Sequence, residues 1–217
     1  MSEKRPYQYF IQPLRFVALL WVIKFFEIYS GIELDYLGIL PRTFTGLKGI
    51  VFAPLIHAGF YHLLSNTFPL LVLGWMLMYF YPQSSRRVFI NVYFFTGVLV
   101  WIFGRQHYHI GASGVVYGLA FFLFVSSLIR NDKRSLAITF FIIFMYGGLV
   151  WGLLPLQEGI SWESHLGGAI SGAVMAFVCR DMDKEEIEPS AEEEEDKLPT
   201  INYKYTYVPK NNDEKQD

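Results

Sequence analysis

Hydrophobic residues gather along this chain into six long runs, and polar residues lie between the runs and after the last one. At a helical rise of about 1.5 Å per residue, runs of this length approach the ~30 Å thickness of bilayer hydrocarbon. A soluble protein would show amphipathic stripes instead, and a membrane β-barrel would show short alternating strands. The pattern therefore predicts an all-α membrane protein with six transmembrane helices, at residues 14–29, 60–80, 88–104, 112–129, 136–154 and 162–179.

Composition supports this interpretation and narrows the chemistry. Of the 217 residues, 53% are hydrophobic and 18% are charged, and the mean hydropathy is +0.29. The formal net charge of −2 is uninformative, because much of the charge lies after Arg180. The single cysteine, Cys179, excludes an internal disulfide and a cysteine-based zinc site. No small-residue cleavage site follows the first run, so we expect that run to remain as a membrane anchor.

The segments outside the runs divide the chain into three parts. Residues 1–13 precede the first run, and residues 14–180 contain all six runs. A long connection at residues 30–59 is apolar enough to lie partly in the membrane interface. Residues 181–217 are acidic and too polar to bury a core, so we expect a disordered tail. Its alternating piece, residues 201–208, could instead pair as a strand with a partner.

Lysine and arginine residues predict the orientation in the membrane. Ten of them fall on one side of the predicted spans, against Arg42, Lys48 and Arg105 on the other. Positively charged residues concentrate in cytoplasmic loops. We therefore expect both termini in the cytoplasm, for an integral protein of the bacterial cytoplasmic (inner) membrane.

A few polar groups lie inside the hydrophobic runs, where unpaired polar groups are costly. Lys24 and Glu27 have the spacing of a structural pair on one helix face. Ser113, His165 and His62 lie roughly 25, 22 and 27 Å from the cytoplasmic ends of their spans. These three spans run in the same direction, so the sequence predicts that the three groups reach a similar depth in the outer leaflet.

Ser113 has two interpretations. A serine at the start of a helix commonly caps the unpaired N–H groups there, but it becomes a nucleophile when a base takes its proton. His165, at the same depth, is the natural base. We find no acidic residue at that depth, so the sequence predicts a Ser113–His165 dyad in which Tyr117 could pack against the imidazole.

Small residues in two spans favour close helix packing. Gly114 and Gly118 have GxxxG spacing in the fourth span, and Gly168 and Gly172 have it in the sixth. Close approach of these two helices would bring His165 toward Ser113. The oxyanion of such a reaction needs hydrogen-bond donors, and the start of the fourth span supplies backbone N–H groups and a favourable dipole.

Three motifs, in order and each on its own span, resemble the rhomboid intramembrane serine proteases. They are LIHAGFYHLLSN at 55–66, GASGVVYG at 111–118 and SHLGGAISG at 164–172. The matching residues are His57, His62 and Asn66, then Gly111, Ser113, Gly114 and Tyr117, then His165 and Gly168. The similarity covers about residues 10–180. One feature departs from the family, because many rhomboids have a Trp-Arg pair in the first loop, where this chain has Lys48 and no tryptophan.

The resemblance implies a six-helix rhomboid bundle that cleaves the transmembrane segments of other proteins through Ser113 and His165. It implies that His62, Asn66 and Gly111 stabilise the oxyanion. It also implies a supporting role for five residues, which are Tyr117, Gly114, Gly168, Gly172 and His57. The fifth span would act as a lateral gate for substrates. The expected partners are transmembrane substrates and the lipid bilayer, with no nucleic acid, metal or cofactor, and the oligomeric state is left open.

Three other functions are weighed against a protease. A catalytically silent rhomboid-like protein would bind membrane proteins without cutting them, although such proteins lack the serine or the histidine. A transporter would need paired intramembrane charges and internal repeats, and only Lys24 and Glu27 fit. A haem or metal protein would use His57, His62 and His165, but two histidines five residues apart lie about 140° apart around a helix, which is unfavourable for one centre.

Overall fold

The computed structural model describes residues 6–130, 132–156 and 159–183, together with residues 204, 206 and 207. The described residues between 6 and 183 form one compact unit. The tail expected to be disordered, with its possible strand at 201–208, lies almost entirely outside the described residues.

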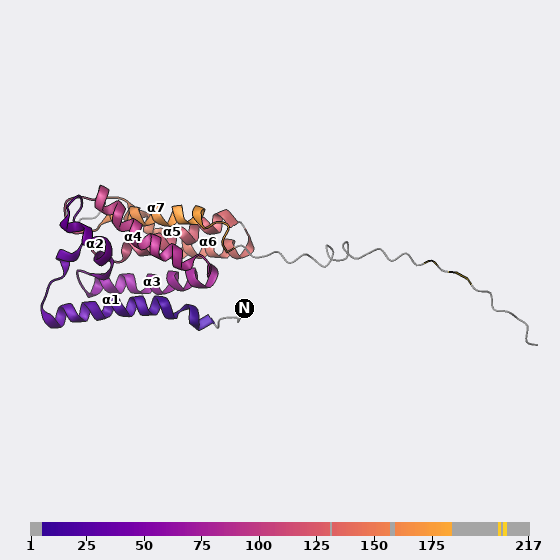
Figure 1. Ribbon diagram of the computed structural model, residues 1–217, viewed down its shortest axis with the longest axis horizontal. Coiled ribbons are helices and arrows are strands. Elements are labelled where there is room, and N and C mark those ends of the chain that lie inside the picture. The colour runs from indigo at the N-terminus through magenta and orange to yellow at the C-terminus, as the bar shows by residue number, and fades with distance from the viewer. Residues whose placement is uncertain (1–5, 131, 157–158, 184–203, 205, 208–217) are drawn as a thin grey trace, which may run out of the picture. The chain divides into compact units, whose positions relative to one another are not determined.

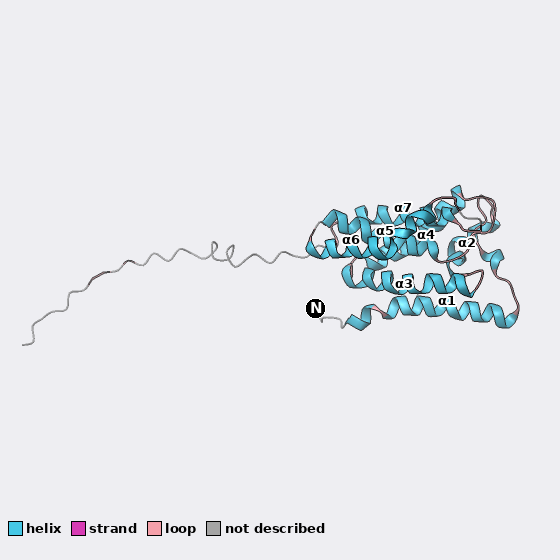
Figure 2. Ribbon diagram, turned by 180° about the vertical axis from the view of Figure 1, so that it is seen from behind, coloured by secondary structure: helices cyan, strands magenta, loops and turns pink. Residues whose placement is uncertain are grey.

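A long helix lies in each of the six hydrophobic runs (Figure 1). These helices are α1 (Ile11–Ser30), α3 (Phe60–Phe80), α4 (Ser85–Phe103), α5 (Ser113–Arg130), α6 (Lys133–Tyr146) and α7 (Trp162–Val178). The described part of the chain contains no strand (Figure 2). Its one isolated bridge joins Ile39 to His109. The predicted all-α class is therefore confirmed.

Four helical segments are long and apolar enough to cross a membrane. They are α3, α4, α5 and the segment Lys133–Leu153, in which the 3₁₀ helix η5 (Gly147–Leu153) continues α6. The helix α1 carries three charged residues, which is too many for the same criterion. The helix α7 has 17 residues and is too short for it. The number of six spans stays a prediction.

The long connection between α1 and α3 is ordered and packs on α4. It contains η2 (Asp35–Leu37), η3 (Thr45–Lys48), α2 (Gly49–Phe52) and η4 (Ala53–Leu55), and the short η1 (Pro6–Tyr9) precedes α1. Tyr93 on α4 donates a hydrogen bond to the Val51 carbonyl at 2.5 Å. The backbone of Ile50 lies so close to Gly97 that a Cβ there would be 3.1 Å from the Ile50 Cα.

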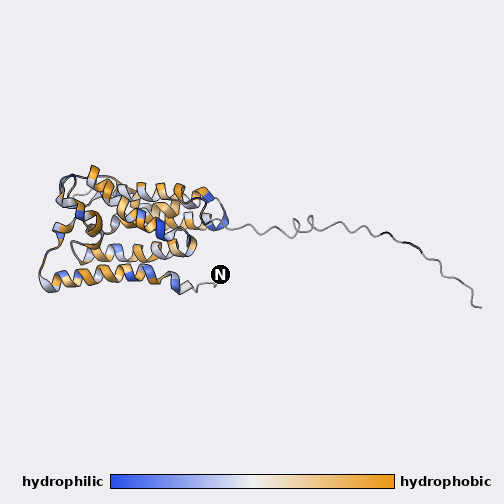
Figure 3. Ribbon diagram, viewed as in Figure 1, coloured by the Kyte–Doolittle hydropathy of each residue, from blue (hydrophilic) through white to orange (hydrophobic). Residues whose placement is uncertain are grey.

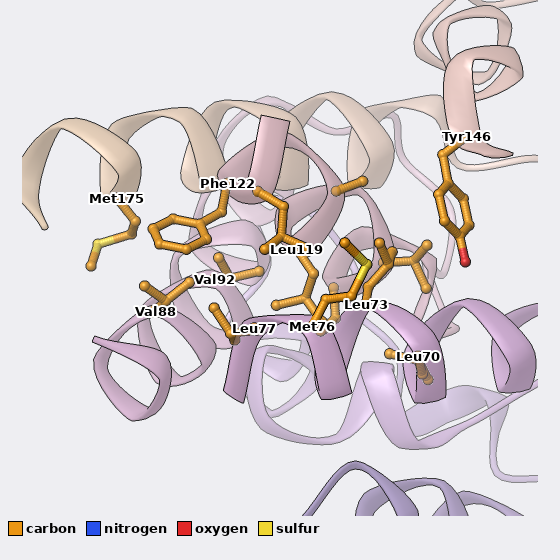
Figure 4. Packing of buried hydrophobic residues seen from close by; sticks show 14 of the residues in the cluster. Leu70, Leu73, Met76, Leu77, Val88, Val92, Leu119, Phe122, Tyr146 and Met175 are labelled. Atoms are coloured by element: carbon orange, nitrogen blue, oxygen red, sulfur yellow. The ribbon is translucent and has the colours of Figure 1, made fainter. Parts of the chain in front are cut away.

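The helix α5 forms the centre of the bundle, since 61% of its span is buried against 39% for α3 and 22% for Lys133–Leu153. Leu119 and Phe122 of α5 meet Leu77 of α3 and Val92 of α4 in the core (Figure 4). Figure 3 shows hydrophobic residues along all of the long helices. Many of these side chains are exposed, and Phe144 is 88% exposed. Such exposed apolar surface suits contact with lipid tails.

The two ends of the compact unit lie at the same end of the bundle (Figures 1 and 2). The ring of Tyr9, just before α1, packs against Tyr79 near the end of α3. Just after α7, the Asp183 carboxylate accepts backbone hydrogen bonds from Gln83 and Ser84 at 2.6 and 3.1 Å. One end of the helical unit thus contacts the last turn of α3 and the other contacts the α3–α4 turn, as expected if both ends lie on the same side of the membrane.

Candidate active site

Ser113 is the first residue of α5, and the two residues before it determine its position. Gly111 has a φ of +108°, in the left-handed region that favours glycine, and its N–H donates to the Ala53 carbonyl at 2.9 Å. The Ala112 N–H donates to His57 Nε2 at 3.3 Å. A Cβ on Gly111 would lie 2.6 Å from the His62 ring. Glycine is therefore required here both by the backbone conformation and by the ring beside it.

His165 lies in the first turn of α7 and faces Ser113. Its Nε2 is 2.9 Å from the Ser113 Oγ, and its Nδ1 is 2.9 Å from the Gly152 carbonyl oxygen. A carbonyl can only accept, so the neutral imidazole carries its proton on Nδ1. Nε2 is then free to accept the Ser113 proton, which is the tautomer that a general base requires.

Tyr117, one turn after Ser113, packs against the face of the His165 imidazole. Its ring stacks on the His165 imidazole with centroids 4.1 Å apart and planes at 6°. Its hydroxyl donates to the Leu149 carbonyl at 2.9 Å. The segment η5 therefore supplies two carbonyl groups, Leu149 and Gly152, that fix the tyrosine and the histidine.

The predicted glycine faces bring α5 and α7 into backbone contact. A Cβ on Gly168 would overlap the Gly114 carbonyl, and a Cβ on Gly172 would overlap the Gly118 carbonyl. A Cβ on Gly114 would lie 3.0 Å from the Ser164 carbonyl oxygen. No larger residue fits without separating the helices, so this contact sets how close His165 comes to Ser113.

The residues expected to stabilise an oxyanion occupy different places. His62 lies against Gly111, beside the start of α5. Asn66 is buried, and its amide donates to the His62 carbonyl at 3.0 Å. Among the described residues, no hydrogen bond joins Asn66 to Ser113 or His165. The structure thus brings His62 and Gly111 to the nucleophile and places Asn66 one turn behind them.

The predicted angle of about 140° between His57 and His62 around one helix is wrong. Since α3 begins at Phe60, His57 lies in the segment before it, and the two rings are 5.0 Å apart. These rings still do not gather with His165. In the described part of the chain, the three residues whose possible metal-ligating atoms lie together are His107, His109 and Glu163.

The expectation of no acidic residue at the depth of the dyad is also wrong. Glu163, two residues before His165, is 7% exposed. Its carboxylate binds Arg105 and not His165, so Ser113 and His165 still form a pair without an acidic third member. The pattern missed Glu163 because acidic residues are common in the first turn of helices. It missed Gly152 because a backbone carbonyl leaves no signal in side chains.

Residues 45–182, which contain every residue of this site, match the family model described as the rhomboid domain. The chain belongs to the rhomboid family. An uncharacterized protein of Mycobacterium tuberculosis is 38% identical over 176 residues, which cover 76% of this chain and 72% of the relative. An uncharacterized protein of Mycobacterium leprae is 36% identical over 177 residues, covering 76% and 69%. The putative rhomboid protease YdcA of Bacillus subtilis is 28% identical over 141 residues, covering 58% and 63%.

Membership in this family and the apolar helices make the protein an integral membrane protein. This rhomboid anchors its first loop without the Trp-Arg pair. Arg42 donates to the Gly104 carbonyl at 2.8 Å, and Trp101 of α4 donates to the Thr43 carbonyl at 2.9 Å. Lys48 lies 4.8 Å from the centre of the Tyr36 ring within the same loop. An arginine and a tryptophan therefore hold the loop from other positions.

Proposed function

We propose that this chain is an intramembrane serine endopeptidase that cleaves peptide bonds in or near the transmembrane segments of other proteins. The observation that carries the proposal is the 2.9 Å contact between His165 Nε2 and Ser113 Oγ, with the imidazole fixed by Gly152 and Tyr117. A helix-capping serine would need no such base. Family membership supports the same activity.

In the acylation step, His165 Nε2 takes the hydroxyl proton while Ser113 Oγ attacks the carbonyl carbon of the substrate. The resulting imidazolium keeps its Nδ1–H bond to the Gly152 carbonyl and lies against the Tyr117 ring. Cation–π attraction and the carbonyl dipole favour this charged form. His165 then gives the proton to the leaving amine, and the acyl group stays on Ser113 as an ester.

The tetrahedral intermediate carries its negative charge beside the start of α5. Backbone N–H groups there have no partner within the helix, and the helix dipole favours an anion at this end. His62, packed on Gly111, is the side chain placed to add a hydrogen bond. A water molecule, activated by His165, hydrolyses the ester and releases Ser113.

The orientation and substrates follow from the same arrangement. Both ends of the helical unit lie beside the end of α3 and the start of α4, which carries Arg86 and Arg87, so we place this end in the cytoplasm. The site at the starts of α5 and α7 then faces the outer side of a bacterial inner membrane. Substrates reach this site from the lipid, so the expected substrate is a transmembrane helix and not a nucleic acid.

The test is cleavage of a single-span model substrate by purified protein in proteoliposomes. Ser113→Ala is expected to abolish cleavage, because no other hydroxyl hydrogen-bonds to His165 Nε2 among the described residues. Ser126→Ala is the matched control. It removes a buried serine from the same helix, roughly 20 Å from Ser113 by the helical rise, and should leave the rate unchanged.

A fluorophosphonate probe tests the pair separately from any substrate. Wild-type protein should be labelled at Ser113, and His165→Ala should lose the labelling because the hydroxyl is no longer activated. Undiminished cleavage by Ser113→Ala would refute the proposal. Wild-type protein that neither cleaves nor takes the label would instead support a silent membrane-binding member of the family.

A further inference from the structure

The loop between α4 and α5 is joined to the first turn of α7 by an ion pair. The Arg105 guanidinium binds both carboxylate oxygens of Glu163, through Nε to Oε1 and through Nη2 to Oε2 at 3.1 Å. The Arg105 backbone N–H also donates to Oε1 at 3.2 Å. The Glu163 side chain is 5% exposed while that of Arg105 is 49% exposed. The carboxylate thus carries three hydrogen bonds from one residue of the loop, with bidentate geometry.

His109 forms a second connection between the same segments. Its buried ring places Nδ1 2.6 Å from the Ser161 Oγ and Nε2 3.0 Å from the Arg105 carbonyl. The carbonyl requires the proton on Nε2, so Nδ1 accepts from the Ser161 hydroxyl. Ser161 caps α7, accepting from the Ser164 N–H at 3.3 Å. The His109 backbone is in turn paired with Ile39 of the first loop in both directions.

These connections lie at matching positions relative to the two candidate catalytic residues. His109 precedes Ser113 by four residues, and Ser161 precedes His165 by four residues. On the other side of the pair, Gly114 and Gly168 bring the two helix backbones into contact. The serine and the histidine are therefore held between a backbone contact and a set of side-chain bonds.

A metal ion does not explain this cluster better than the bonds themselves. The possible ligand atoms of His107, His109 and Glu163 lie within 4.8 Å of one another. However, both ring nitrogens of His109 and both oxygens of Glu163 already have partners in the chain. A cation would also have to displace the positively charged guanidinium of Arg105.

We propose that Arg105–Glu163 and His109–Ser161 form a clamp that sets the distance between Ser113 and His165, with Glu163 and His109 as positioning residues. The inference rests on the proposed function. Neither residue hydrogen-bonds to Ser113 or His165, so each acts through the backbone that leads to the pair. A displacement of about 1 Å between reacting groups can lower a rate about 100-fold, which makes such a clamp important for catalysis.

Side-chain replacements can separate the two bonds of His109. His109→Asn places an amide where Nδ1 lies and can keep the bond to Ser161, whereas His109→Gln reaches the position of Nε2 and loses that bond. For the ion pair, Glu163→Ala removes both acceptors, and Glu163→Gln keeps one oxygen for Arg105. The matched control is Gln106→Ala. Gln106 lies in the same loop but donates to the Pro41 carbonyl at 2.8 Å and not to α7.

The clamp predicts a specific set of kinetic changes. Glu163→Ala and His109→Gln should lower kcat and the rate of fluorophosphonate labelling together, by about 10-fold to 100-fold, with KM unchanged. His109→Asn, Glu163→Gln and Gln106→Ala should stay closer to wild type. Amide hydrogen exchange at residues 113–117 and 165–168 should rise in the two damaging variants, because the starts of α5 and α7 are less firmly held.

Three outcomes would overturn the clamp. The first is unchanged kcat, labelling and hydrogen exchange in Glu163→Ala and His109→Gln. The second is that Gln106→Ala loses Tm, kcat and labelling rate as much as Glu163→Ala and His109→Gln do, which would indicate only a structural role for the loop. The third is equal loss in His109→Asn and His109→Gln. If wild-type protein neither cleaves nor is labelled, the proposed function fails, while hydrogen exchange at the two helix starts still decides the clamp.

Discussion

Replacement of Gly168 by alanine is the most direct test of the contact between α5 and α7. The added Cβ would overlap the Gly114 carbonyl, and it would lie 2.9 Å from that carbonyl carbon and 3.2 Å from the Gly114 Cα. All of these atoms belong to backbone, which cannot rotate away as a side chain can. The helices must therefore separate.

The size of the effect follows from these distances. Relieving the overlap with the Gly114 carbonyl oxygen, which is the closest of the three atoms, requires a shift of roughly 1 Å. Overpacking of this kind costs about 1–3 kcal/mol, and we expect a value near the upper limit. His165 lies one turn before Gly168, so the 2.9 Å contact with Ser113 would exceed hydrogen-bonding distance. We expect kcat to fall about 100-fold.

The assay compares Gly168→Ala with Gly167→Ala, its neighbour in the chain. A Cβ on Gly167 would lie 3.5 Å from the Leu99 Cβ and from the Thr96 carbonyl oxygen, which are ordinary contacts. The control should keep its kcat, and its Tm should be unchanged or higher, because alanine favours a helix by up to about 1 kcal/mol over glycine. Equal kcat and Tm in the two variants would refute the reasoning.

Two further predictions concern residues around the pair. Tyr117→Phe keeps the ring on His165 but leaves the Leu149 carbonyl without its donor, so it should cost about 1 kcal/mol in unfolding free energy with a small loss of kcat. Tyr117→Ala also removes the stacked ring, and its kcat should fall at least about tenfold further; equal kcat values would contradict a role for stacking. Burial lowers the pKa of His57 from 6.5 to about 3. Between these two pH values the unfolded chain protonates His57 and the folded chain does not. The free energy of unfolding should therefore decrease as the pH falls from 6.5 toward 3, by up to about 1.4 kcal/mol per pH unit. Thermal unfolding in detergent between pH 7 and pH 4.5 should show this slope in wild type and a smaller one in His57→Gln, and equal slopes would contradict it.

Much of the site was predictable because it depends on local sequence. The depth estimates for Ser113, His62 and His165 needed only helix direction and rise per residue. The GxxxG spacings of Gly114–Gly118 and Gly168–Gly172 needed only the rule that small residues allow close approach. Both kinds of rule act along a single helix, so no knowledge of the neighbouring elements was required.

Errors arose where a residue's partner came from another segment. In the sequence, Glu163 is an ordinary acidic residue at the start of a helix. In the structure it forms an ion pair with Arg105, which lies 58 positions earlier in the chain. The spacing predicts a helical His57, but α3 begins after this residue and its ring accepts a hydrogen bond from the Ala112 N–H. Side-chain type and spacing do not encode such pairings, because they depend on how loops return to the bundle.

The sequence by itself determined the all-helical class, the positions of the long helices and the three motifs of the family. These properties follow from hydrophobic run length and residue identity. Only the tertiary structure decided what orients His165, since the Gly152 carbonyl is a backbone group that any residue would provide. It also decided how the loop before Ser113 joins the start of α7, through Arg105–Glu163 and His109–Ser161. Those contacts exist because packing brings distant segments together, and packing is a property of the whole fold rather than of any one stretch.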